Sequence, residues 1–220
     1  MKQTFEEYLK GIRKIAKEEG FEELDETYVE HLRCRFFGES VVIGTSGRVR
    51  LRELRLSDLE AFSKLPDAKQ EPVLKAFLKE DEKTSLEYLK AYISHTYPFY
   101  DYGIYGAELL ENGELIGLCG LGQVKIYGEA CTDLGYYISP GWRRQGLAKE
   151  CVEIVLDYAK NYLEFPLIYA IIKEENRISE KILCDFGFEL IGRGNENGES
   201  ELIFQKEFKK EEKAHEGEQQ

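Results

Sequence analysis

The chain has 220 residues, of which 42% are hydrophobic, so it can bury one substantial core and a single catalytic or binding unit is the default expectation. Its formal charge is −12 and its pI is about 4.9. This charge argues against nucleic acid as the main partner, because binding to a phosphate backbone rests on Lys and Arg. An acidic surface attracts cationic substrates, although a solvated acidic face is the commoner reason for such a balance.

The cysteines indicate a reducing compartment. They are Cys34, Cys119, Cys131, Cys151 and Cys184; they form no C-x-x-C pair, and several fall in apolar runs. The N-terminus has no apolar signal region, and the longest apolar run, LIYAII, is far shorter than the ~20 residues that span a bilayer. We therefore expect a cytoplasmic protein, monomer or homodimer, with no membrane partner.

Two amphipathic helices are predicted at the N-terminus. Apolar residues recur at helical spacing from Phe5 to Ala16, and a second, shorter set from Tyr28 to Phe36 ends before Gly38. We predict residues 1–45 as a helical extension. Its apolar faces must be buried, either on the domain that follows or on a second subunit.

The pattern over residues 46–208 predicts one mixed α/β (α+β) domain. RVRLREL alternates as a half-buried strand, SDLEAF begins a helix with Ser57 as candidate N-cap, and TSLEYLKAYI is a further helix. IYGAELLENGELIGLCGLG has the Asn-Gly signal of a tight hairpin. A strand at TDLGYYIS, a helix, a buried strand at LIYAII, a helix over 176–186 and the strands FELIG and ELIFQKEF complete the order.

This order joins two antiparallel meanders by a strand–helix–strand crossover. It therefore requires a mixed, mostly antiparallel central sheet flanked by helices on both faces. The tail over 209–220 has almost nothing to bury, and we predict that it is disordered.

The stretch WRRQGLAKECVEIVLDYAK, residues 142–160, places arginines and a glycine before a helix. A helix start presents unpaired N–H groups and a partial positive charge, which together hold phosphate. Gly146 allows close backbone approach, Ala148 leaves room for a pyrophosphate, and Arg143 and Arg144 can neutralise its charge. Two common nucleotide loops, G-x-x-x-x-G-K-[ST] and G-x-G-x-x-G, are not present in suitable context. Alone, the motif fits a helix entry with incidental surface arginines equally well.

The segment YYISPGWRRQGLA resembles the acetyl-CoA loop of the GCN5-related N-acetyltransferase (GNAT) family, written [QR]-x-x-G-x-[GA] and placed between a strand and a helix. The family's next landmark is matched about thirty residues later by Asn176, Ser179 and Gly187-Phe188. LGYYISP with NRIS is most similar to the RimJ/RimL branch. The resemblance covers roughly residues 48–206 and implies a GNAT-type sheet, acetyl-CoA as co-substrate and no metal.

The resemblance also implies a set of cofactor-binding residues: Tyr136, Tyr137, Ile138, Arg143, Arg144, Gln145, Gly146, Leu147, Ala148, Asn176 and Ser179. Backbone groups of residues 136–138 are expected to line the pantetheine arm, and a main-chain N–H there to polarise the thioester carbonyl. The Asn176 amide can both donate to and accept from the pantetheine. Trp142 can stack on the cofactor, but covering the helix start is the favoured interpretation.

In this family the amine attacks the thioester directly, so no nucleophilic side chain is required. A protonated amine must first lose a proton; Asp133 is the first candidate for the base and Glu108 the reserve. Many members carry a tyrosine acid seven residues after the Asn, where this chain has Leu183, so Ser179 becomes the candidate hydrogen-bond donor. A solvated strand-edge acid and a packing serine remain the structural alternatives.

The sequence thus predicts an enzyme that transfers acetyl from acetyl-CoA to a primary amine. A peptide N-terminus is the favoured acceptor, ahead of polyamines, aminoglycosides and other small amines. The alternative, supported by Leu183, is a non-catalytic module of the same fold that binds or senses acyl-CoA. We expect the N-terminal helices to pack near the acceptor side of the domain, with a dimer contact as the alternative.

Overall fold

The computed structural model describes residues 3–65, 71–196 and 199–209. Its helices are α1 (Phe5–Glu18), α2 (Glu26–Phe37), α3 (Asp58–Lys64), α4 (Pro72–Lys75), α5 (Glu82–Tyr100), α6 (Leu147–Asn161) and α7 (Arg177–Asp185), with a 3-10 helix at Pro140–Trp142. Its strands are β1 (Val42–Thr45), β2 (Val49–Arg52), β3 (Ile104–Leu109), β4 (Leu115–Ile126), β5 (Glu129–Ile138), β6 (Leu167–Lys173), β7 (Glu189–Glu196) and β8 (Glu199–Glu207). Except for residue 209, the predicted disordered tail lies outside the described residues.

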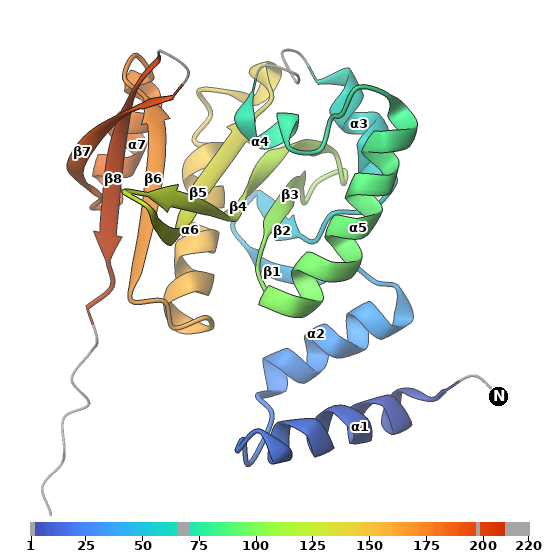
Figure 1. Ribbon diagram of the computed structural model, residues 1–220. Helices are drawn as coiled ribbons and strands as arrows, with labels where there is room; N and C mark the ends of the chain where they lie inside the picture. Colours follow the sequence, from blue (N-terminus) through green and yellow to red (C-terminus); the bar gives the residue numbers. More distant parts are fainter. Residues whose placement is uncertain (1–2, 66–70, 197–198, 210–220) are drawn as a thin grey trace, which may run out of the picture.

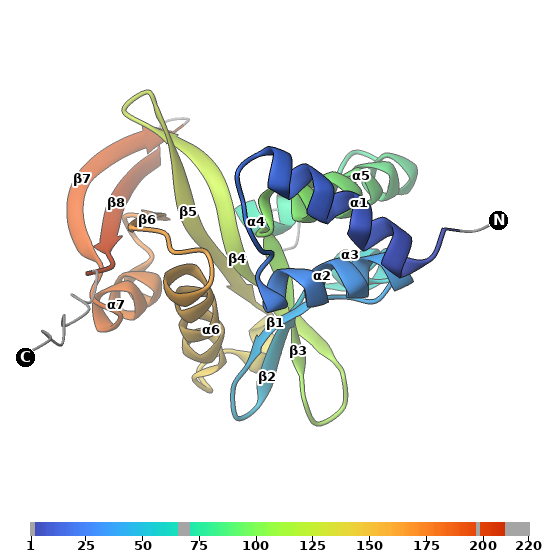
Figure 2. The same ribbon diagram turned by 90° about the horizontal axis from the view of Figure 1, so that it is seen from below.

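The described strands form one eight-stranded sheet in the order β1-β2-β3-β4-β5-β6-β8-β7. Neighbouring strands run antiparallel except for β5 and β6, which run parallel because α6 forms the crossover between them. Helices α6 and α7 lie on one face of the sheet, and α3, α4 and α5 lie on the other (Figures 1 and 2). The predicted mixed, mostly antiparallel sheet with helices on both faces is confirmed.

Each face of the sheet has its own apolar core. Leu134, Val152 and Ile168 are buried on the side of α6, whereas Phe62 and Leu118 are buried with α3 and α5. Burying a side chain of this size stabilises the fold by about 1.5–3 kcal/mol. Because side chains alternate along a strand, successive residues of β5 contribute to the two cores in turn.

Local signals place several boundaries as predicted, and one fails. Gly38 ends α2 in the left-handed conformation at φ 74°, and Gly113 adopts φ 73° in the predicted Asn-Gly hairpin. Ser57, in contrast, makes no side-chain cap at the start of α3. The Asp58 carboxylate there accepts from the backbone N–H of Arg55 at 2.7 Å and also pairs with Arg52, so it orders the turn that precedes α3 without capping the helix.

Strand β1 lies inside the segment predicted as a helical extension. It pairs with β2 at the edge of the sheet, so the helical part of the extension ends at Phe37. The strand has only four residues, VIGT, and none of them is fully buried. A strand this short shows no alternation that the sequence could reveal.

Helix α2 packs on its own domain, and α1 packs on α2. The rings of Phe5 and Tyr8 contact that of Phe36 with centroids 5.5 and 5.3 Å apart. Arg35 joins α2 to Glu53 and to Asp101, which follows α5. Asp101 also accepts a hydrogen bond from Tyr162 at the end of α6, and His31 lies beside it.

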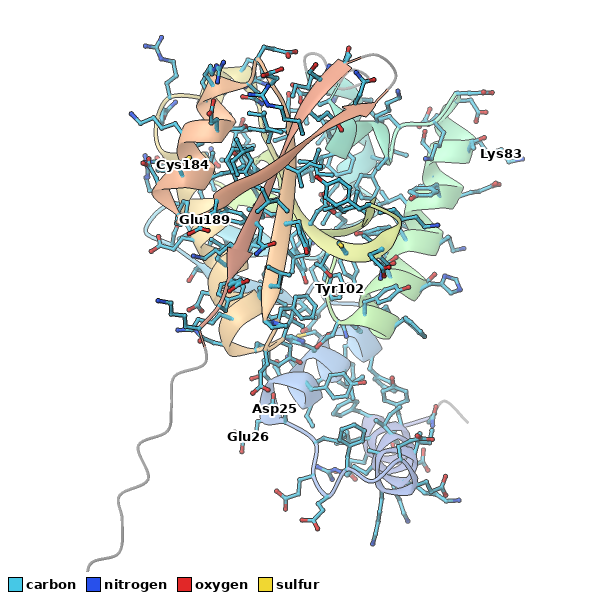
Figure 3. All side chains as sticks on the ribbon, turned by 60° about the vertical axis from the view of Figure 1, so that its left-hand side comes forward. Asp25, Glu26, Lys83, Tyr102, Cys184 and Glu189 are labelled. Atoms are coloured by element: carbon cyan, nitrogen blue, oxygen red, sulfur yellow. The ribbon has the colours of Figure 1, made fainter. Side chains whose placement is uncertain are left out.

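The contacts of Arg35 and His31 with the domain fix the position of the extension. It lies at the C-terminal end of α6, opposite the loop over 143–148, and its expected position near the acceptor stays a prediction. Figure 3 shows Asp25 and Glu26 of α2 at the lower end of the molecule, remote from Cys184 of α7. The buried charges of Glu53 and Asp101 lie at that lower end, and pairing them requires Arg35 there.

Candidate functional site

The two parallel strands at the centre of the sheet separate. β5 and β6 pair at Asp133 and Tyr169 and diverge toward their C-terminal ends (Figure 1). A cavity of about 530 Å³ opens where they part. It is lined by Glu71, Tyr136, Tyr137, Ile138, Trp142, Arg143, Arg144, Gly146, Leu147, Ala148, Lys149, Asn176, Arg177, Ile178, Ser179, Lys181 and Ile182. The structure therefore brings together every residue predicted to bind the cofactor except Gln145.

A larger cavity, of about 1040 Å³, lies between α3 and the start of α5. Its wall includes Glu60, Asp81 and Ser85 but none of the predicted site residues. The smaller cavity has the convergent cations and backbone groups that mark a binding site, so we take it as the functional one.

The loop that leads into α6 is shaped for an anion. Arg144 and Gly146 both adopt left-handed backbone conformations, at φ 64° and 84°. Such a conformation is strained for arginine and is characteristic of functional loops. Arg143 Nε donates to the carbonyl of Ile138 at 2.7 Å, which ties the loop to the end of β5 and occupies one of the backbone acceptors expected to line the pantetheine.

Helix α6 begins without a side-chain cap. Thr4, Asp25, Asp81 and Asn176 cap α1, α2, α5 and α7, whereas Gly146 provides no side chain at the start of α6. The start of α6 therefore lacks the side-chain acceptor that these other helices have for their first N–H groups. An external anion is the natural partner for such a helix start.

Positive side chains surround this opening in an otherwise acidic protein. Arg143, Arg144, Lys149, Arg177 and Lys181 line the cavity, against the single acidic residue Glu71. Several are neutralised in part: Arg143 lies 3.6 Å from Glu71, and Lys149 lies 2.7 Å from Asp185. The remaining excess of positive charge suits a ligand that carries several phosphates.

Arg48 holds the loop from the far edge of the sheet and was missed by sequence reasoning. Its Nη2 donates to the carbonyl of Gln145 at 2.7 Å, and its Nε donates to Glu150 of α6 at 2.7 Å. The Gln145 carbonyl thus faces Arg48, its side-chain amide donates to the carbonyl of Gly141 at 3.4 Å, and the residue does not line the cavity. The contact spans 97 residues of sequence, and no local pattern in the chain indicates it.

Asn176 and Ser179 form the opposite wall. Asn176 Oδ1 accepts from the backbone N–H of Ser179 at 3.1 Å and caps α7, so the amide NH₂ is the part of Asn176 that can donate to a ligand. Ser179 is buried and lines the cavity. Leu183, one turn further, is fully buried in the core.

Asp133 lies where the strands begin to diverge. It shares a face of β5 with Gly135 and Tyr137, on the side of α4, and it does not line the cavity itself. Burial raises the pKa of its carboxyl to about 6. Gly122 on the neighbouring strand leaves space beside it, since a Cβ there would lie 3.0 Å from Asp133 Oδ1.

Glu108 has different surroundings. Arg50 pairs with one of its carboxylate oxygens, and Arg52 with the other at 2.6 Å. Burial alone would raise the pKa of Glu108, but the arginine hydrogen bonds hold it below its ordinary value. Both oxygens are engaged and the residue does not line the cavity, so Glu108 is a poor candidate for accepting a proton there.

Among the described residues, no group of three or more His, Cys, Asp or Glu side chains could hold a metal ion. In the same part of the chain, no helix combines the length and apolar character needed to cross a membrane.

Three solved structures illustrate the similarity of the fold. The ribosomal-protein-S5-alanine acetyltransferase of Vibrio fischeri is 14% identical, with a TM-score of 0.60 over 76% of this chain and 96% of that one. RimL, a ribosomal L7/L12 α-N-protein acetyltransferase solved in complex with coenzyme A, is 13% identical, with a TM-score of 0.60 over 76% and 98%. The spermidine/spermine N-acetyltransferase SpeG of Vibrio cholerae is 18% identical, with a TM-score of 0.58 over 74% and 95%.

The first two of these structures come from the branch that the sequence resembles. At such identities they establish the fold alone. A family model described as an acetyltransferase (GNAT) domain matches residues 48–189, more than half of the chain. The protein therefore belongs to the GNAT family and is an acyltransferase.

Proposed function

We propose that the protein transfers an acetyl group from acetyl-CoA to the α-amino group of a peptide. The observation that supports acetyl-CoA as the donor is the cavity between β5 and β6, where the uncapped start of α6 and the surrounding cations meet. A helix start with neighbouring arginines suits the pyrophosphate of CoA, and the narrow opening between strands suits its pantetheine arm. Acetyl-CoA brings the activated thioester.

The chain's own residues would then act on the acceptor. Asp133 takes the proton that the amine must lose, directly or through a water. With a pKa of about 6, its carboxylate is mostly ionised at neutral pH yet basic enough to accept a proton. A main-chain N–H in residues 136–138 stabilises negative charge on the carbonyl oxygen, and Ser179 donates to the departing sulfur. No acyl-enzyme is needed.

The acceptor class has weaker support than the cofactor. The resemblance of LGYYISP and NRIS to the RimJ/RimL branch favours a peptide N-terminus. Two of the proteins with a similar fold are ribosomal-protein acetyltransferases. The net charge of −12 and the likeness to a polyamine acetyltransferase keep spermidine-like cations as the second candidate. This proposal implies that the protein acts in the cytoplasm, where acetyl-CoA is available.

Titration calorimetry with acetyl-CoA, ATP and NAD tests the cofactor. We expect a saturable isotherm with acetyl-CoA only; binding of ATP or NAD with no signal from acetyl-CoA would overturn the assignment.

A screen that measures thiol release tests the acceptor. It pairs peptides with free N-termini, the same peptides with blocked N-termini, and spermidine. Release with free peptides alone supports the proposal, whereas release with spermidine alone replaces the acceptor. Acetyl-CoA binding without thiol release from any amine would favour the non-catalytic acyl-CoA-binding module.

A further inference from the structure

The hydroxyl of Tyr136 is buried beside the cavity without a hydrogen-bond partner of good geometry among the described residues. Tyr136 extends from β5 toward the core on the α6 face. Leaving a buried hydroxyl unpaired costs about 1–3 kcal/mol, and such groups are rare in folded proteins. The cost indicates that this hydroxyl serves a purpose other than the stability of the fold.

Ser179 is the hydroxyl residue that adjoins it. Burial raises the pKa of the Tyr136 phenol to about 12, and the Ser179 side chain partly offsets the rise. The phenol therefore stays protonated at every working pH and keeps a hydrogen that it can donate. Ser179 is set in place because its backbone N–H is held by Asn176 Oδ1, which fixes the first turn of α7.

The two hydroxyl groups have different access to the cavity. The Tyr136 hydroxyl oxygen is closed off from solvent, whereas Ser179 retains 9% exposure at the cavity wall. A ligand can therefore reach Ser179 but not the Tyr136 oxygen. Any effect of the Tyr136 hydroxyl on chemistry in the cavity must therefore pass through Ser179.

The chemistry needs a donor here. Cleavage of a thioester leaves a thiolate, and the turn of α7 that follows Ser179 presents Leu183, which is fully buried and has no polar group. Tyr137, the other tyrosine of the wall, belongs to the core on the opposite face of β5. Ser179 and Tyr136 are thus the hydroxyl residues on the α7 side of the described cavity wall.

We propose that Tyr136 is a positioning residue whose Oη–H donates to Ser179 Oγ, so that the Ser179 O–H is directed at the sulfur of CoA. This inference rests on the proposed function. As the carbon–sulfur bond breaks, its electron pair moves to sulfur, and the chain of hydroxyl groups stabilises that charge without losing a proton. The amine proton leaves through Asp133, and the thiolate takes a proton from solvent on release. Successive hydrogen bonds strengthen one another in such a chain.

Calorimetry with CoA and with desulfo-CoA, which lacks the sulfur, tests this role without catalysis. Tyr136→Phe should weaken the binding of CoA above the pKa of its thiol by about three- to tenfold, the worth of one hydrogen bond to a charged group. Its affinity for desulfo-CoA should not change. An equal loss for both ligands, or no loss for either, would overturn the proposal.

A double-mutant cycle tests whether Tyr136 acts through Ser179. Tyr136→Phe and Ser179→Ala should each lower kcat by about tenfold with little change in the KM for acetyl-CoA, and the double variant should be no slower than Ser179→Ala alone. If the two losses multiply, the residues act independently and the relay is excluded.

Stability provides the control for misfolding. Tyr136→Phe removes both the cost of burying the hydroxyl and its proposed hydrogen bond to Ser179, which roughly offset each other, so its melting temperature should stay close to that of the wild type. Tyr92→Phe is the matched control: its hydroxyl accepts from the Ile104 N–H at 2.8 Å, so it should melt lower while discriminating CoA from desulfo-CoA normally. A wild type that binds neither CoA nor acetyl-CoA refutes the proposed function; a wild type that binds both, with an indistinguishable Tyr136→Phe variant, refutes this inference alone.

Discussion

Asp133 is the residue whose chemistry depends most on its surroundings. The same carboxyl in water has a pKa near 3.8, but burial at the divergence of β5 and β6 raises it to about 6. Burial disfavours the charged form, and no cation in the described structure offsets it as the arginines do for Glu108. The pKa of Asp133 is therefore raised and that of Glu108 is lowered, although both acids lie in one sheet.

We predict that Asp133→Asn lowers kcat by ~10²–10⁴ and leaves the affinity for acetyl-CoA nearly intact. In the wild type, kcat/KM should rise with pH through about 6 as the carboxyl ionises, and this limb should vanish in the variant. Asp157→Asn, on the exposed side of α6, is the control and should retain the wild-type profile. A loss below about threefold would move the base to solvent.

The same substitution should have a signature in stability. Because the pKa of Asp133 is raised in the folded state, its contribution to stability is full below pH 3.8 and is lost as the pH rises through about 6. Above that range the ionised, buried carboxylate destabilises the fold. Asp133→Asn should therefore melt at or above the wild-type temperature at pH 8, as differential scanning calorimetry can show.

Gly146 offers a second test at a single residue. Gly146→Asp should reduce acetyl-CoA affinity by at least ~100-fold, because the carboxylate would itself occupy the N-terminus of α6 and repel the pyrophosphate. The fold should survive, since Asp is a favourable residue at a helix start. Gly128→Asp controls for backbone strain, because Gly128 also has a left-handed φ, 92°, and lies in the hairpin between β4 and β5. Unchanged affinity of Gly146→Asp would place the anion elsewhere.

Between elements, buried ion pairs decide how α2 is attached. Arg35 Nη2 lies 2.6 Å from both Glu53 and Asp101, and these three side chains are largely buried. Removing the Arg35 guanidinium would leave the Glu53 and Asp101 carboxylates in a site of low polarity without this positive charge. The neighbouring Arg33 instead forms exposed pairs with Glu30 and Glu39.

We predict that Arg35→Met destabilises the protein by about 3–5 kcal/mol, whereas Arg33→Met changes stability by less than about 1 kcal/mol. The loss should be greater at pH 8 than at pH 5, because burial already raises the pKa of Glu53 and its ionised form depends on Arg35. Urea unfolding at the two pH values measures both. Equal effects of the two variants would mean that α2 is held by its apolar contacts alone.

For the whole molecule, the cavity and the extension lie at opposite ends of α6. Helix α1 has no buried residue among those described and rests on α2, whereas α2 carries the buried His31 and Leu32. The extension therefore has two parts, one peripheral and one that completes the domain.

We predict that deleting residues 1–24 leaves kcat, both KM values and the melting temperature nearly unchanged, whereas deleting residues 1–38 destabilises the domain strongly. The second deletion leaves Glu53 and Asp101 without Arg35. Steady-state kinetics, thermal melts and solution mass measure the outcome. An altered acceptor KM in the shorter deletion would place α1 near the acceptor, and the loss of a dimer that the full chain forms would make α1 a dimer contact.

The sequence by itself determined the features that depend on residues close together in the chain. The loop from Arg143 to Ala148, the cap formed by Asn176, the turn at Gly113 and the end of α2 at Gly38 are local, because helix starts, helix ends and tight hairpins are built within a few residues. The order of the predicted strands and helices also determined the mixed sheet, since a strand–helix–strand crossover demands a parallel pair of strands.

Only the tertiary structure decided which distant side chains meet. Arg48 reaches Gln145 across the sheet, Arg52 engages Glu108, and Tyr136 of β5 lies beside Ser179 of α7. The pKa of Asp133 likewise follows from burial by strands and helices far away in sequence. A charge or a hydroxyl group takes its energy from the polarity and partners around it, and these are set when the sheet assembles rather than by neighbours in the chain.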